Sequence, residues 1–147
     1  MVSNEEISVN KRNGRGKESL NIEKIHSMVG FATEGITGVS ASHVEMNSGI
    51  QFFDGVSTAD IQQILIKSAN DLISLENPNY QYVAARLLLF QLRKQLFHRL
   101  WDHPKFIDHI KTLIDKGLYD KDILANYDES EIDRMGMWID HERDYNF

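Results

Sequence analysis

One long apolar segment constrains the fold of this chain more than any other feature. The sequence predicts a single helix from Tyr80 to about Trp101, and its stretch Val83–Phe90 is apolar on nearly every side. A helix that is apolar on nearly every side is expected to be surrounded by other helices. The sequence therefore predicts a mainly α fold with this helix at its centre.

Shorter helices are predicted on both sides of the central one. Asn21 is a suitable N-cap for a first helix that Gly35 ends, and a second helix is expected from about Ser42 to Phe53. Ser57 or Thr58 would cap a third, whose apolar stripe includes Ile61, Leu65 and Ala69. After the central helix, the pattern changes to short amphipathic helices at about 106–116, 122–127 and 129–140.

The N-terminal segment has the pattern of a β-hairpin. Ile7 and Val9 alternate with polar neighbours, Asn13-Gly14 supplies turn chemistry, and a short return strand passes through Glu18 and Leu20. The nearby Gly14-Arg15-Gly16 is predicted to be part of this turn rather than a phosphate-binding loop, because it lacks the P-loop pattern. The expected fold class is thus mainly α with a small N-terminal β-hairpin cap.

Composition excludes several classes of function. The 147 residues include 16 Lys and Arg against 22 Asp and Glu, and a net charge of -6 argues against nucleic acid as a partner. With no cysteine, the chain cannot form disulfides or a thiolate metal site. No apolar run is long enough to span a membrane, and the first six residues lack the apolar core of a signal peptide. We therefore expect a cytoplasmic protein without a membrane partner.

Several basic and polar residues stand out in this acidic chain. Five basic residues lie close together near the N-terminus: Lys11, Arg12, Arg15, Lys17 and Lys24. Thr58 can either cap a helix or contribute to the kind of helix start that binds phosphate. Lys94 follows Leu87 and Phe90 on one helix face, where it could be a lysine whose head reaches solvent or a ligand contact.

The six histidines invite a metal interpretation, which their spacing does not favour. His98, His103 and His109 lie near acidic residues, but none belongs to an HExxH or another recognised ligand pattern. We interpret them, and the charged run at 140–144, as solvated helix ends. No metal site and no catalytic residues are predicted.

Taken together, five spaced motifs resemble a known family. They are V-x-K-R-x-G from Val9, E-x-x-N-x-x-K-I from Glu18, D-G-x-x-T-x-D-I from Asp54, P-x-Y-Q-Y-x-A-A-R-L from Pro78 and F-x-L-R-K from Phe90. In this order they resemble the ATP-cone at the N-terminus of the large (alpha) subunit of class I ribonucleotide reductase. Later segments resemble the entry to that subunit's catalytic barrel. The resemblance implies an ATP-cone helical domain at 1–97 and the helical start of a truncated catalytic barrel domain at 98–147.

In that family the cone is an allosteric site, which ATP occupies to activate the reductase and dATP to inhibit it. The resemblance implies that ATP or dATP binds here with Mg²⁺, that basic side chains meet the phosphates, and that the segment 18–24 walls the pocket. Gln62 stands one helical turn after Thr58, where some relatives carry His. The implied nucleotide-binding residues are Lys11, Arg12, Glu18, Ser19, Leu20, Asn21, Ile22, Glu23, Lys24, Thr58, Gln62 and Lys94.

Two departures from the family pattern limit what the resemblance implies. The hairpin turn has about one extra residue near Gly16. The family's reaction also needs a radical-bearing cysteine and a redox-active cysteine pair, and this chain has none. We therefore expect an N-terminal piece, either truncated or one part of a split subunit, that is inactive alone. Its expected partners are the remainder of the large subunit, the radical-generating small subunit and further copies in a homo-oligomer of the full subunit.

Two alternative functions remain at this point. ATP-cones also occur in transcriptional regulators that join the cone to a cysteine zinc ribbon, although the lack of cysteine and the acidic charge argue against DNA binding here. The other alternative is a free-standing helical interaction module that binds no nucleotide.

Overall fold

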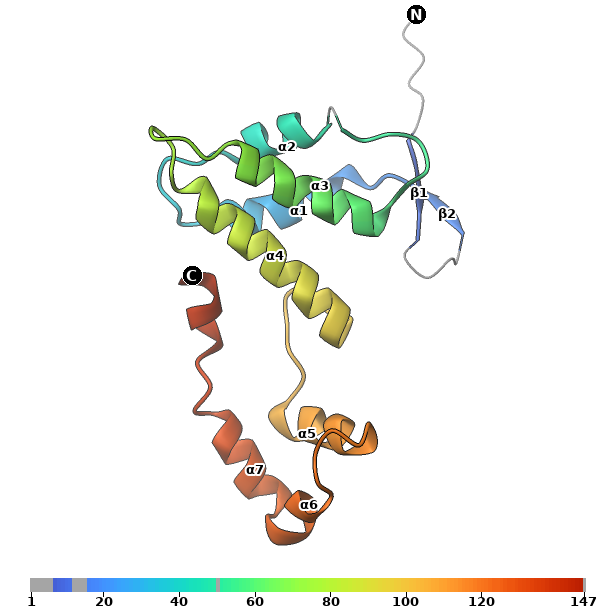
Figure 1. The fold of residues 1–147 in the computed structure, drawn as a ribbon, viewed down its shortest axis with the longest axis vertical. Helices are drawn as coiled ribbons and strands as arrows, with labels where there is room; N and C mark the ends of the chain where they lie inside the picture. The colour runs from blue at the N-terminus through green and yellow to red at the C-terminus, as the bar shows by residue number, and fades with distance from the viewer. Residues whose placement is uncertain (1–6, 12–15, 50, 147) are drawn as a thin grey trace, which may run out of the picture. The chain divides into compact units, whose positions relative to one another are not determined.

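The computed structural model describes residues 7–11, 16–49 and 51–146, which form two compact units. The first unit extends to Gln91 and the second is Leu92–Asn146. Figure 1 shows the helices of the first unit, which are α1 (Ile22–Thr33), α2 (Ala41–Gly49), α3 (Thr58–Asp71) and most of α4 (Tyr80–Phe97). The predicted fold class, mainly α with a small N-terminal β-hairpin cap, is confirmed.

Three short strands form the sheet of the first unit, in the order β2-β1-β3. β1 (Ser8–Asn10) pairs antiparallel with β2 (Lys17–Ser19), as the hairpin pattern predicts. The predicted turn at 13–14 lies outside the described residues. β1 also pairs in parallel with β3 (Val56–Ser57), a strand that the sequence did not reveal because two residues are too few to show an alternating pattern.

The core of the first unit includes one face of α4, together with residues of the other helices and of the sheet. Val83, Leu87 and Phe90 of α4 are fully or almost fully buried, as is Val9 of the central strand. Leu88, in contrast, remains 47% exposed. The prediction that other helices surround the α4 segment therefore holds for one face of the helix in this structure and not for the face that carries Leu88.

The helix ends follow local chemistry in most cases. Asn21 caps α1, as predicted, and Ser57 rather than Thr58 caps α3 through a reciprocal capping box with Asp60. α2 ends at Gly49, before the predicted Phe53, in a segment of poor helix formers. α4 ends at Phe97, before the predicted Trp101, because His98 adopts a left-handed conformation with φ of 59° that a continuing helix cannot contain.

The second unit contains the end of α4 and three short helices around a small core. These helices are α5 (Phe106–Asp115), α6 (Asp122–Asn126) and α7 (Glu129–Gly136), followed by a 3₁₀ helix, η1, at His141–Asn146. Ile107 and Ile110 of α5 pack with Ile132 of α7. The guanidinium of the buried Arg93 donates to the Tyr145 hydroxyl (2.6 Å) and to Asp144 (3.0 Å), which ties η1 to α4. The helix predicted at 129–140 begins as predicted but ends at Gly136, and η1 lies beyond the predicted range.

The division between the two units falls inside α4, between Gln91 and Leu92. The sequence predicts a boundary near residue 98, where α4 ends. The last residues of α4 belong to the second unit because Arg93 binds Tyr145 and Asp144 of η1. The assignment of 1–97 to an ATP-cone and of 98–147 to the start of a catalytic domain stays a prediction.

Candidate functional site

The three-stranded sheet brings together candidate residues that are far apart in the sequence. β1 lies in the middle, so its neighbours lead into two different helices: β2 continues to α1, and β3 continues directly to α3. The parallel register pairs Asn10 with Ser57. Lys11 comes directly after Asn10, and Thr58 comes directly after Ser57. Because the two strands are parallel, Lys11 and Thr58 both lie at the same end of the β1–β3 pair.

Lys11 is fixed to the hairpin by two interactions. Its backbone amide donates to the carbonyl of Gly16 at 3.1 Å, and its ammonium lies 3.0 Å from Glu18 Oε2. Both side chains are about half exposed, so water screens this pair and the pair contributes little to stability. Lys11 and Glu18 are therefore available to a ligand that competes for either charge. Arg12, the neighbouring candidate, lies outside the described residues.

The start of α1 holds the next group of candidates. Asn21 Oδ1 accepts from the backbone amide of Lys24 at 3.0 Å, so this oxygen already serves as the helix cap. The Lys24 side chain is exposed, and within the described part of the chain it forms no ion pair. An exposed ammonium on the first turn of a helix is well placed to meet an anion, because the helix start attracts negative charge.

The other residues of the segment 18–24 differ in exposure. Leu20 is half-buried where β2 leads into α1, and its amide donates to the carbonyl of Ile7 at 2.9 Å. Ser19, Ile22 and Glu23 are exposed. Ile22 is 71% exposed, which leaves an apolar side chain in water at the first position of α1. Such a side chain is suited to contact the apolar face of a ligand.

Thr58 and Gln62 lie on the first two turns of α3. Ser57 supplies the cap, so the half-buried Thr58 is the first helical residue and its hydroxyl does not serve as the cap. Gln62 is only 6% exposed, and its side-chain amide donates to the carbonyl of Leu87 at 3.0 Å. Gln62 thus connects α3 to α4 from inside the first unit.

Lys94 lies on α4 three residues beyond Gln91, within the second unit. Its side chain is exposed, and it takes part in no ion pair between described residues. The other described candidates belong to the first unit. A common site that includes Lys94 therefore remains a prediction.

Sequence reasoning missed the contacts between β1 and the turn that precedes β3. Asp54 accepts hydrogen bonds from the backbone amide (2.9 Å) and the hydroxyl (2.5 Å) of Ser8. These bonds, the hydroxyl first, lower the pKa of Asp54 below its usual value. In the sequence, Asp54-Gly55 stands out only as the start of one family motif, and its contact with Ser8 is not visible because Ser8 lies more than forty residues away.

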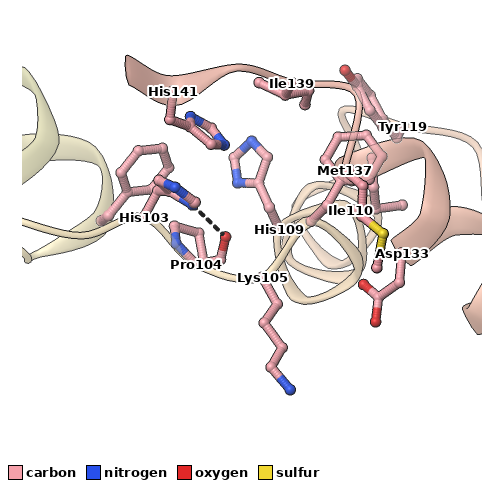
Figure 2. A pocket seen from close by; sticks show the side chains of 13 residues that line it. His103, Pro104, Lys105, His109, Ile110, Tyr119, Asp133, Met137, Ile139 and His141 are labelled. Carbon is pink, nitrogen blue, oxygen red and sulfur yellow. Dashed lines mark hydrogen bonds between the residues drawn. The ribbon is translucent and has the colours of Figure 1, made fainter. Parts of the chain in front are cut away.

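The second unit contains a separate cavity of about 550 Å³, which Figure 2 shows. His103, His109 and His141 line it, with His103 and His141 stacked at 3.4 Å between ring centroids. Burial, followed by the neighbouring His103, lowers the pKa of His141. His98 is exposed, whereas His103 and His109 are half-buried and line this cavity, so the interpretation as solvated helix ends describes His98 better than the other two. No group of three or more His, Asp or Glu side chains suited to hold a metal ion exists among the described residues.

None of the described helices is both long and apolar enough to cross a membrane.

Comparison with known families gives a match over most of the first unit and the start of the second. The family described as the ATP cone domain matches residues 7–95. This range contains every candidate nucleotide-binding residue from Lys11 to Lys94.

Individual proteins with similar sequences extend the likeness beyond residue 95. The chain is 44% identical to ribonucleoside-diphosphate reductase 1 subunit alpha of Escherichia coli over 144 residues, which are 98% of this chain and 19% of that protein. It is 45% identical to the subunit alpha of Buchnera aphidicola from Acyrthosiphon pisum, over 96% of this chain and 18% of that protein. The subunit alpha of Enterobacteria phage T4 is 40% identical over the same shares. The chain spans about a fifth of the length of these curated relatives.

Proposed function

This chain belongs to the ATP-cone family, and we propose that it is the N-terminal allosteric part of a ribonucleoside-diphosphate reductase large subunit. In this proposal the chain binds ATP or dATP, and the bound nucleotide regulates the reduction of ribonucleoside diphosphates to deoxyribonucleotides. The family match supports nucleotide binding. The names of the similar proteins support the reductase, because the chain matches them over almost its entire length.

The observation that carries the proposal is the register of the small sheet. It places Lys11 and Thr58 at one end of the β1–β3 pair, and β2 leads from the same hairpin into the start of α1, where Lys24 is exposed. Two ammonium groups and two helix starts are the features that bind a polyphosphate, through charge-assisted hydrogen bonds and the helix dipole. Arg12 and Lys94 would add further positive charge.

Selectivity for the base and sugar requires polar atoms that both donate and accept. Glu18 offers acceptors, and Asn21 offers an amide whose oxygen is already used as the helix cap, so its NH₂ group is the part suited to a ligand. Ser19, Leu20, Ile22 and Glu23 would wall the pocket between these two residues and Lys24. The exposed Ile22 would cover the apolar face of the base.

Magnesium would enter with the nucleotide. Mg²⁺ binds phosphate oxygens with one or two carboxylates and retains several waters, so it needs no cage of protein ligands. Glu18, which lies 3.0 Å from the ammonium of Lys11, would be one such carboxylate.

The reductase activity would come from other polypeptides. A chain without cysteine cannot supply the thiols for radical transfer and for the redox-active pair. We propose that the remainder of the large subunit supplies them, that a small subunit generates the radical, and that the full subunit forms a homo-oligomer in the cytoplasm. Nucleic acid and membranes are not proposed as partners.

Calorimetric titration with ATP and dATP in the presence of Mg²⁺ tests nucleotide binding directly. We expect the purified chain to bind, and Lys24→Ala and Lys94→Ala each to weaken binding by about 1.5 to 3 kcal/mol, because each loses a charge-assisted contact with a phosphate. Lys67→Ala is a matched control, since Lys67 is an exposed lysine on α3 that pairs with Asp71.

Two results would contradict this proposal. A chain that binds neither nucleotide would instead be an interaction module without an effector. If the chain binds but both lysine variants retain the affinity of the unmodified chain, nucleotide binding would stand and this placement of the phosphates would be wrong.

A further inference from the structure

Four hydrogen bonds fasten β1 to the turn that precedes β3. Asp54 accepts from the amide and the hydroxyl of Ser8 (2.9 and 2.5 Å). The amide of Gly55 donates to the carbonyl of Ser8 at 2.8 Å, and its carbonyl accepts from the side chain of Asn10 at 2.7 Å. Together, Ser8, Asn10, Asp54 and Gly55 form what we call the hairpin clamp.

The chemistry of the clamp makes it stronger than an ordinary surface contact. The bonds from Ser8 are to a carboxylate and lower the pKa of Asp54, and hydrogen bonds to a charged acceptor are shorter and stronger than neutral ones. Gly55 adopts a φ of 82°, a left-handed conformation that glycine accepts without strain. The turn therefore presents the Asp54 carboxylate and both Gly55 backbone groups to the same strand.

The clamp is needed because the strand pairing that it supports is very short. Only Val9–Val56 and Asn10–Ser57 are paired between β1 and β3. A two-residue parallel pairing is marginal by itself, and parallel pairs are slightly weaker per residue than antiparallel ones. The same register sets where Lys11 leaves β1 and where Thr58 begins α3.

We propose that Asp54 is a positioning residue of the nucleotide site: by holding Ser8 it keeps β1 in register with β3, and so keeps Lys11 beside the start of α3. This inference rests on the proposed function, since it assigns a role toward the same nucleotide. Asp54 acts through β1 and does not itself touch the ligand, whose phosphates its negative charge would repel.

The test measures ATP affinity by calorimetry in the presence of Mg²⁺. We expect Asp54→Ala to raise the Kd for ATP about tenfold. This is the increase expected if only about a tenth of the variant molecules have β1 and β3 paired in the register that binds ATP. Asp54→Asn keeps an oxygen that can accept from Ser8, and we expect it to restore most of the affinity. Asp71→Ala, which removes an exposed carboxylate of α3, is the control and should bind like the unmodified chain.

A double-mutant cycle separates positioning from a general loss of structure. If Asp54 positions Lys11, then Lys11→Ala should weaken binding by a smaller factor in the Asp54→Ala background than in the unmodified chain. Lys24→Ala should weaken binding by the same factor in both backgrounds, because Lys24 lies on α1 and not on the clamped strand. Circular dichroism of each variant checks that the helices remain.

Several outcomes would overturn the inference while leaving the proposed function intact. These are an unchanged affinity in Asp54→Ala, equal factors for Lys11→Ala in both backgrounds, or a loss of helical signal that accompanies the loss of affinity. If the unmodified chain binds no nucleotide, the proposed function fails, and the role of Asp54 toward that ligand fails with it.

Discussion

Gln62 is a proposed site residue whose side chain is also part of the fold. Its amide donates to the carbonyl of Leu87, and this bond links α3 to α4 one helical turn beyond Thr58. A neutral amide both donates and accepts, whereas a histidine at the same position can also become cationic. In the proposed site, a histidine at position 62 would therefore change the electrostatics through its charge.

We predict that Gln62→His alters the ratio of the ATP and dATP affinities. The two nucleotides differ by one hydroxyl, and discrimination of a hydroxyl depends on which polar groups are left unpaired. Calorimetry of both nucleotides gives the ratio, and Gln63→His, at the exposed neighbouring position, is the control. If the ratio in Gln62→His equals that of the unmodified chain, another residue discriminates between the nucleotides.

At the scale of elements, the contact between α5 and α7 leaves almost no spare room. Gly136 is the last residue of α7, and a Cβ atom placed there would lie 2.5 Å from the Cβ of Phe106 at the start of α5. A Cβ atom is held by the backbone and cannot rotate away. The two helices approach closely because residue 136 has no side chain.

We predict that Gly136→Ala destabilises the second unit by about 1 to 3 kcal/mol, the usual cost of overpacking. Gly30→Ala is the matched control: Gly30 lies inside α1, where an added Cβ meets no atom within 4 Å. That change should stabilise α1 by about 0.5 to 1 kcal/mol, since alanine favours the helix. Urea unfolding of both variants gives the two free energies. Equal stability of Gly136→Ala and the unmodified chain would mean that α5 and α7 can separate at no cost.

At the scale of the whole molecule, we predict that the chain alone has no reductase activity, even with a radical-generating small subunit, reductant and effector. No side chain in it can carry the radical as a thiol or form the disulfide that takes up the oxidised state. The assay measures deoxyribonucleoside diphosphate formation, first with the chain alone and then with a polypeptide that carries the remaining part of the large subunit. Turnover by the chain alone would refute the prediction, and turnover only after complementation would support a split enzyme.

Local chemistry was enough to locate most elements of the fold. The cap at Asn21, the apolar stripes and the turn glycine Gly35 predicted α1 and α3, because helix signals act between residues three or four positions apart. The spaced motifs indicated the family before any geometry was known, since each motif is a local pattern and only their order spans the chain. The roles of the individual site residues remain predictions.

The tertiary contacts that the sequence missed depend on residues far apart along the chain. β3, the hairpin clamp between Ser8 and Asp54, and the burial of Gln62 against Leu87 arise from contacts over 25 residues or more. A two-residue strand, a polar turn and a glutamine are each compatible with many environments. Their local sequence therefore does not indicate which distant residue each of them contacts. The tertiary structure decides which partner each one has. The apolar face of α4 becomes buried and the short sheet becomes paired only when these distant segments come together.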